Sequence, residues 1–201
     1  MRPRASELDP RLWRAVYALA IITTLGLVLP LPSKAFDPSK ARPEPWADPR
    51  RRAIYLFHIA RFVEWPVTAF GERDTLHLCV IGQTPVARAL EEAVKGRRIH
   101  SRMPLVRTPV NTAETAGCHL VYLGVEQSFQ LRQFLRSLEG LPILTVGELP
   151  MFTERGGMIN FVRTTKKLTF EINQEAARRG RLRISSQLLR VASKVRVGGG
   201  R

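Results

Sequence analysis

Apolar and polar residues alternate with two different periods along this chain, and the change of period predicts alternating helices and strands. Apolar positions recur at helical spacing from Ala53 to Val63, and Pro66 ends that pattern. The strands expected after it are Leu76 to Ile81, Met103 to Val110, Cys118 to Gly124 and Ile143 to Val146, and the expected helices are Pro85 to Lys95 and Glu126 to Leu138. This alternation indicates an α/β fold with a mostly parallel or mixed sheet, flanked by helices on both faces.

The segment from Gly156 to Ala192 predicts a C-terminal β-hairpin followed by a closing helix. Two β-rich runs, Met158 to Val162 and Leu168 to Asn173, are separated by the polar residues 163–167. In the second run apolar residues alternate with polar ones, so that one face should meet the core. The helix after it is expected to have an N-cap at Ser185 and Ser186 and an apolar stripe of Leu188, Val191, Ala192 and Val195.

The first 35 residues have the pattern of a secretory signal peptide. Arginines precede an apolar run from Ala15 to Leu31, and Ser33-Lys34-Ala35 supplies small residues at a cleavage site. An uncleaved inner-membrane anchor is the alternative, because this run approaches the roughly 17 residues that span a bilayer. Residues 36–50 are rich in proline and predict a disordered leader. A single domain is then expected over residues 51–197, with a flexible tail at 198–201.

The chain is strongly basic, with a formal net charge of +15. Removal of residues 1–35 leaves 27 basic against 15 acidic residues, so the exported part keeps a net charge of +12. The basic residues are dispersed, and no zinc finger, helix-turn-helix or RNA-binding motif accompanies them, so we expect no nucleic-acid partner. Two interpretations remain: a solvated arginine-rich surface, or attraction to an anionic membrane or an acidic partner.

No sequence motif for catalysis or metal binding is found. The four histidines lack a metal-binding spacing, and the two cysteines are not closely paired as in a zinc site. Ser185 lacks the flanking glycines of a nucleophile elbow, and Gly156-Gly157 lacks the lysine of a phosphate loop. We therefore expect a protein that is not an enzyme and that needs no cofactor or metal.

Two polar sets remain as candidates for partner binding. Glu64 and Trp65 follow the first helix, where the Trp65 ring could pack in the core or serve as a recognition aromatic. Asn160, Glu171 and Asn173 should share the polar face of the hairpin. That face is either solvated, or it forms a buried hydrogen-bond network or a partner site.

Cys79 and Cys118 are the only cysteines, and an even pair in an exported chain favours a disulfide. In the doubly wound order the third strand returns beside the first, which would make the two cysteine-bearing strands neighbours. Two buried free thiols are the alternative.

Several segments together resemble the YfiR family of small exported bacterial proteins. They are the segment 156–192, Phe62-Val63-Glu64-Trp65-Pro66, Leu78-Cys79-Val80-Ile81-Gly82 and Gly117-Cys118-His119. The resemblance implies a periplasmic protein that binds an inner-membrane diguanylate cyclase or sensor kinase and represses it, with an outer-membrane lipoprotein as a competitor. It also implies a disulfide between Cys79 and Cys118. Some relatives carry a second cysteine pair that this chain lacks, which weakens the case for a redox switch.

A different class of function also fits the residues. Doubly wound sheets bind small ligands at the carboxyl ends of their strands, where Gly82, Gln83, Thr84 or Gly124 would lie. The alternative function is therefore a periplasmic small-ligand binding domain that feeds a membrane sensor. For either function a homodimer is expected from the frequency of two-fold symmetric assemblies.

Overall fold

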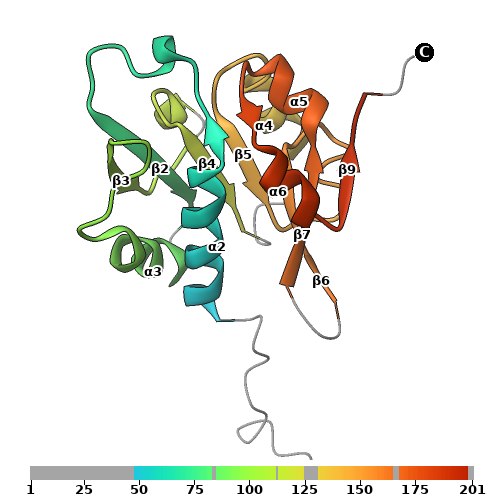
Figure 1. Cartoon of the computed structure of the whole chain (residues 1–201), viewed down its shortest axis with the longest axis horizontal. Helices are drawn as coiled ribbons and strands as arrows, with labels where there is room; N and C mark the ends of the chain where they lie inside the picture. The colour runs from blue at the N-terminus through green and yellow to red at the C-terminus, as the bar shows by residue number, and fades with distance from the viewer. Residues whose placement is uncertain (1–47, 83–84, 112, 125–130, 165–167, 199–201) are drawn as a thin grey trace, which may run out of the picture. The chain divides into compact units, whose positions relative to one another are not determined.

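A computed structural model describes residues 48–82, 85–111, 113–124, 131–164 and 168–198, and Figure 1 shows their arrangement. Their main feature is a seven-stranded mixed sheet in the order β3-β2-β4-β5-β6-β7-β9. The strands are β2 (Thr75–Ile81), β3 (Met103–Arg107), β4 (Leu120–Leu123), β5 (Leu144–Gly147), β6 (Ile159–Arg163), β7 (Leu168–Asn173) and β9 (Lys194–Arg196). The strands from β3 to β6 pair in parallel, whereas β7 is antiparallel to β6. The predicted α/β class and the return of the third strand beside the first are confirmed.

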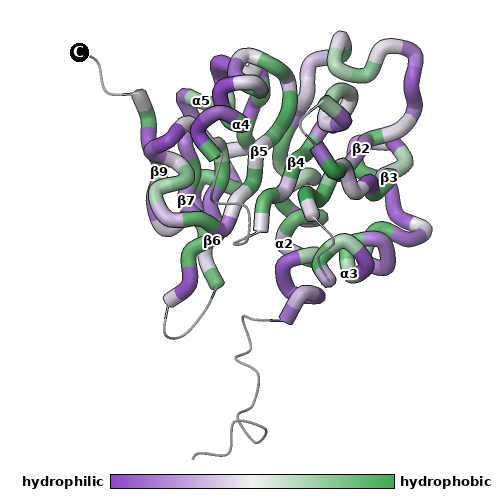
Figure 2. The backbone as a smooth tube through the Cα atoms, turned by 180° about the vertical axis from the view of Figure 1, so that it is seen from behind, coloured by the Kyte–Doolittle hydropathy of each residue, from purple (hydrophilic) through white to green (hydrophobic). Residues whose placement is uncertain are grey.

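Helices cover both faces of this sheet, and each face has its own hydrophobic core. On one face α2 (Pro49–Arg61), α3 (Pro85–Val94) and α6 (Ser186–Val191) contribute side chains to the larger core. On the other face α4 (Leu131–Ser137) packs over a smaller core that includes Phe152 and both cysteines. All four residues of the central strand β4 are buried, as expected for a parallel strand that is covered on both faces. Figure 2 shows how hydrophobic and hydrophilic residues are distributed along the backbone, seen from behind.

The first helix begins and ends earlier than its apolar pattern indicates. It begins at Pro49, with Asp48 as N-cap: the Arg50 backbone N–H donates to Asp48 Oδ1 at 2.9 Å. It ends at Arg61, so the expectation that Val63 is helical is wrong. Val63 is still fully buried, but as part of β1 (Val63–Glu64), which pairs antiparallel with β8 (Arg183–Ile184). Val63 would be buried in either a helix or a short strand, so its apolar character did not distinguish the two structures.

The hairpin of β6 and β7 is confirmed, with Phe161 opposite Phe170. It does not form the edge of the sheet, because β9 pairs in parallel with β7 outside it. The predicted helical stripe is wrong at two of its four positions: Val191 is 65% exposed, and Val195 lies in β9. A short helix that the pattern did not predict, α5 (Gln174–Arg179), follows the hairpin directly.

The other elements match their predicted positions with shifted ends. The strand expected at 103–110 ends at Arg107, and the strand expected at 118–124 begins only at Leu120. The 3-10 turns η2 (Val67–Ala69) and η3 (Ala113–Thr115) precede β2 and β4. The predicted signal peptide, most of the leader, residues 126–130 of the predicted helix, and residues 199–201 of the tail lie outside the described residues. Within the described part, no helix combines the length and apolar character that crossing a bilayer requires.

Candidate functional site

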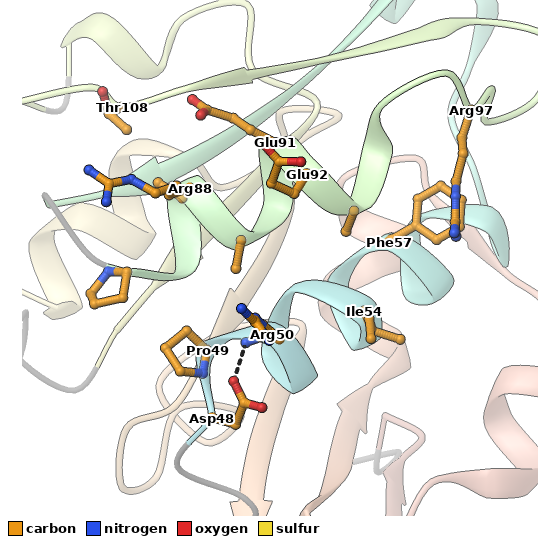
Figure 3. A pocket seen from close by; sticks show the side chains of 14 residues that line it. Asp48, Pro49, Arg50, Ile54, Phe57, Arg88, Glu91, Glu92, Arg97 and Thr108 are labelled. Carbon is orange, nitrogen blue, oxygen red and sulfur yellow. Dashed lines mark hydrogen bonds between the residues drawn. The ribbon is translucent and has the colours of Figure 1, made fainter.

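An open groove lies between α2 and α3, and we call it the α2–α3 groove (Figure 3). Its volume is about 970 Å³. Ile54 and Phe57 line it from α2, and Ala89 and Ala93 line it from α3. Ile54 is 48% exposed, although it lies on a helix that otherwise buries its apolar face. An apolar side chain exposed inside a concave surface is typical of a binding site rather than of a solvated helix face.

Charged groups of both signs surround this apolar floor. Arg50, Arg88 and Arg97 are the basic lining residues, and Asp48, Glu91 and Glu92 are the acidic ones. The Arg97 guanidinium lies over the Phe57 ring, 5.1 Å from its centroid, as Figure 3 shows. The groove can therefore take an amphipathic segment that buries apolar side chains and pairs its own charges at the rim. No sequence motif marked these residues, because the groove is formed by two helices that are separate in the chain.

Trp65 belongs to an aromatic cluster at the amino-terminal end of the sheet. Its ring is 8% exposed, and its Nε1–H donates to the backbone oxygen of His119 at 2.9 Å. The His119 ring stacks on Phe70 with centroids 4.6 Å apart, and the Arg102 guanidinium lies 3.7 Å from the Phe70 centroid. The structure thus favours core packing for Trp65 over an exposed recognition aromatic.

His119 is held as a neutral ring. Its Nδ1 accepts a hydrogen bond from the His77 backbone N–H at 2.9 Å, so the ring proton lies on Nε2, which is 3.2 Å from the Ala69 oxygen. Burial, together with the charges of His77, Arg73 and Arg102, lowers the pKa of His119 from 6.5 to about 4. Protonation of Nδ1 would also replace this acceptor by a second donor facing the His77 N–H.

A disulfide joins Cys79 to Cys118 beside this cluster, with the two Cα atoms 6.0 Å apart. Cys79 lies in β2, but Cys118 precedes β4, so the expectation that both lie in strands is wrong. The bridge ties the middle of β2 to the segment that connects β3 with β4. Both residues are buried in the smaller core, Cys79 fully and Cys118 with 3% exposure.

The hairpin polar set lies mainly inside the protein. Asn160 Oδ1 accepts from the Leu149 backbone N–H at 3.2 Å, and Asn173 Nδ2 donates to the Thr153 oxygen at 2.8 Å. Asn173 also caps α5 by accepting from the Ala176 N–H. Glu171 is half-buried and accepts from the Thr153 hydroxyl at 3.4 Å. Of the interpretations left open by the sequence, the buried hydrogen-bond network describes both asparagines.

This network positions the turn that holds Phe152, which is fully buried in the smaller core. Gly147 and Gly157 lie against opposite edges of the Phe152 ring, where a Cβ on either would overlap ring atoms. The two glycines are therefore required by the close approach of this ring.

A buried charged group that the sequence analysis missed connects α2 with the carboxyl end of the sheet. Arg52 Nε lies 2.9 Å from both carboxylate oxygens of Glu148, and the Tyr122 hydroxyl donates to Glu148 at 3.3 Å. Burial and the Glu148 charge raise the pKa of Tyr122, which keeps its hydroxyl a donor. Arg52 and Glu148 are far apart in sequence, so no local spacing could have indicated the pair.

The remaining predicted residues are exposed or cap a helix. Glu64 in β1 is exposed, 3.6 Å from Arg183 in β8. Ser185 is the N-cap of α6, accepting from the Leu188 N–H at 3.3 Å, whereas Ser186 is the first residue of that helix. Among the residues that the structure describes, no group of His, Cys, Asp or Glu is placed to hold a metal ion.

A family model described as YfiR/HmsC-like matches residues 50–193, which is well over half of the chain. The chain belongs to the YfiR/HmsC-like family. The matched residues run from the first turn of α2 to the residue before β9, so the family domain contains both cores, the disulfide and most of the residues that line the α2–α3 groove. This family is periplasmic and regulatory rather than catalytic. The resemblance drawn from the sequence is thereby confirmed.

Proposed function

We propose that this YfiR/HmsC-like protein binds the periplasmic part of an inner-membrane diguanylate cyclase and represses it. The family match over residues 50–193 carries the proposal. The α2–α3 groove supports it, because an apolar floor with charges at its rim suits a protein segment. We place the partner-binding surface there and on exposed Glu64, while the burial of Trp65, Asn160 and Asn173 gives them supporting positions.

Repression follows from differential binding. The protein must bind the inactive state of the cyclase more tightly than the active state, and a coupling of about 1 to 3 kcal/mol is usual. A competitor for the same surface, such as an outer-membrane lipoprotein, would then raise cyclase activity without contacting the cyclase. Export by cleavage after Ala35 and a homodimeric state are parts of the same proposal, and amino-terminal sequencing and sedimentation test them.

In-cell crosslinking and measurement of cyclic di-GMP test the proposal together. A photocrosslinking residue at Ile54, in the groove, should capture a membrane protein with a cyclase domain, and gene deletion should raise cyclic di-GMP. The matched control is the same residue at Met151, which is 60% exposed and lies next to the smaller core on the other face. Equal capture at both positions would remove the groove from the proposal, and an unchanged cyclic di-GMP level with no captured cyclase would reject the function.

One observation also favours a small ligand as a second candidate. The groove volume of about 970 Å³ lies at the upper end of the range of small-molecule pockets. A thermal-shift screen of the exported chain against amino acids, nucleotides and cofactors would show a ligand as a concentration-dependent rise in melting temperature. If the rise in melting temperature caused by a ligand disappears in Ile54→Glu, that ligand binds in the α2–α3 groove.

A further inference from the structure

The strand β3 lies at one edge of the sheet, near α3 (Figure 1). It forms one wall of a second groove, and the end of α3 with the residues after it forms the other wall. This β3 groove has a volume of about 530 Å³. Residues 103–106 line it from the strand, and residues 94–98 line it from the helix end. β3 is the first strand in the sheet order and has a neighbour, β2, on one side only. An edge strand beside a helix is the geometry in which extended peptides add to a sheet.

The hydrogen-bonding groups on the free side of β3 follow from its register with β2. The Met103 N–H donates to the Asp74 oxygen at 3.1 Å, so Met103 directs its backbone toward β2. In a parallel pair successive residues direct their backbone N–H and C=O groups alternately toward the neighbouring strand and away from it. Leu105 and Arg107 therefore also face β2. The carbonyls of Pro104 and Val106 and the Val106 N–H point to the open side. Since Pro104 has no N–H, Val106 is the donor within this strand that an added strand could use.

Apolar side chains of β3 are exposed beside these groups. Met103 is 56% exposed and Leu105 is 49% exposed, on the face of the strand opposite to Val106. Val106 is half-buried and packs against the larger core under α2 and α3. An added strand would cover Met103 and Leu105 with alternate side chains and would leave the packing of Val106 unchanged.

The charges around the β3 groove determine which partner fits. Lys95, Arg97 and Arg98 line it and are exposed, whereas Glu91 is the one acidic residue among its described lining residues. Arg107 lies on the same face of the strand as Leu105 and adds to the positive charge. A second copy would bring the same cations to the same edge, and like charges across an interface are repulsive. Carboxylates on the incoming segment would complement this edge.

We propose that β3 accepts an acidic extended segment of a partner protein as an additional strand, with apolar residues alternating with Asp or Glu. The inference deepens the proposed function and rests on it in one respect, that the partner is a protein. The opposing explanation is that Pro104 and the cations only protect an exposed edge from pairing. The two explanations predict different states of the Val106 N–H. Strand addition uses it in a hydrogen bond to the partner, whereas edge protection leaves it exposed to water.

The test uses the exported chain and two arrays of labelled octapeptides. One array alternates Val or Ile with Asp or Glu, and the other has Lys or Arg in place of the acids. We expect binding by the acidic array at low salt, weakening as salt rises, and slower hydrogen exchange at the Val106 amide in the complex. Lys95→Glu should weaken binding by about two- to fivefold, as for one exposed ion pair. Arg132→Glu makes the same charge change on α4, across the sheet, and should have no effect.

Val106→Pro removes the outward donor without removing a bond to β2, and it should abolish peptide binding while the melting temperature shows whether the fold is kept. Should that variant fail to fold, hydrogen exchange at Val106 in the unaltered chain still decides the matter.

Three results would overturn the proposal. They are equal binding of both arrays, acidic binding that leaves the Val106 amide exchanging freely, and protection of that amide in the chain without peptide, by a second copy or by residues 36–47. None of these measurements involves cyclic di-GMP, so their failure is distinct from failure of the proposed repression.

Discussion

Acidification should destabilise this protein through His119, because the folded structure favours the neutral form of the ring. The pKa of His119 is about 4 in the folded protein and 6.5 without the fold. Between these values the unfolded chain binds a proton that the folded chain does not, so the free energy of unfolding falls as pH decreases. The contribution is complete above pH 6.5 and is lost progressively toward pH 4.

The expected size of this effect follows from the two pKa values. At pH 5 nearly all unfolded rings are protonated while most folded rings are neutral, which lowers the free energy of unfolding by about 2 kcal/mol relative to pH 7.5. His77 adds a change of the same sign, since burial and then Arg107 lower its pKa as well. With a urea slope of about 2 kcal/mol per molar, the His119 contribution alone moves the midpoint by about 1 M.

Urea denaturation at pH 7.5 and pH 5, followed by far-UV circular dichroism, measures the effect, and His119→Asn isolates it. Asparagine places an oxygen where Nδ1 lies, so it can still accept from the His77 backbone N–H, but it does not titrate. The variant should be less stable at pH 7.5, because it loses the stacking on Phe70, and its decline between the two pH values should be smaller by about 2 kcal/mol. Equal declines in the two proteins would refute the assignment of the acid sensitivity to His119.

Three further perturbations have definite expected outcomes. Cys118→Ala should lower the free energy of unfolding by about 4 kcal/mol, since the bridge spans 39 residues, and unaltered protein with a reductant should match it in urea denaturation. Gly157→Ala should cost about 1 to 3 kcal/mol through its overlap with the Phe152 ring, and Phe152→Leu should cost less in that background than alone; additive costs in thermal melts would contradict this contact. Glu148→Gln should cost about 3 kcal/mol because it leaves Arg52 buried beside a neutral amide, whereas Glu64→Gln, at an exposed pair, should change stability by less than about 1 kcal/mol; similar melting temperatures for the two variants would show that burial does not determine the cost.

The sequence was most informative where one local pattern had one structural meaning. The alternation in Leu168–Asn173 predicted a half-buried strand, and Phe170 and Ile172 are buried in the larger core while Glu171 stays half-buried. The strands β2 and β5 were likewise placed to within a residue at each end. In these segments local propensity and tertiary packing favour the same structure.

The pattern failed where distant residues decided the outcome. Val63 and Val195 continue helical stripes in the sequence, but each pairs with a distant strand, and that pairing overrides the local period. The α2–α3 groove and the Arg52–Glu148 pair need two elements from different parts of the chain, and single-sequence patterns contain no distance between them. Asn160 and Asn173 could not be assigned to solvent or interior because the turn that covers them has no regular period.

The position of the disulfide has a consequence for when this protein becomes stable. If the chain is exported as proposed above, its precursor is made in the reducing cytosol, where the segment between β3 and β4 would not be tied to β2. The precursor would then lack the contribution of about 4 kcal/mol estimated above. Small domains have only about 5 to 15 kcal/mol in total, so a newly made chain would lack a large part of the free energy of unfolding that the bridged domain has. An easily unfolded precursor suits a secretion channel that passes extended chains. Oxidation after export would then stabilise the folded domain, so that it resists the unfolding that passage back through the channel requires.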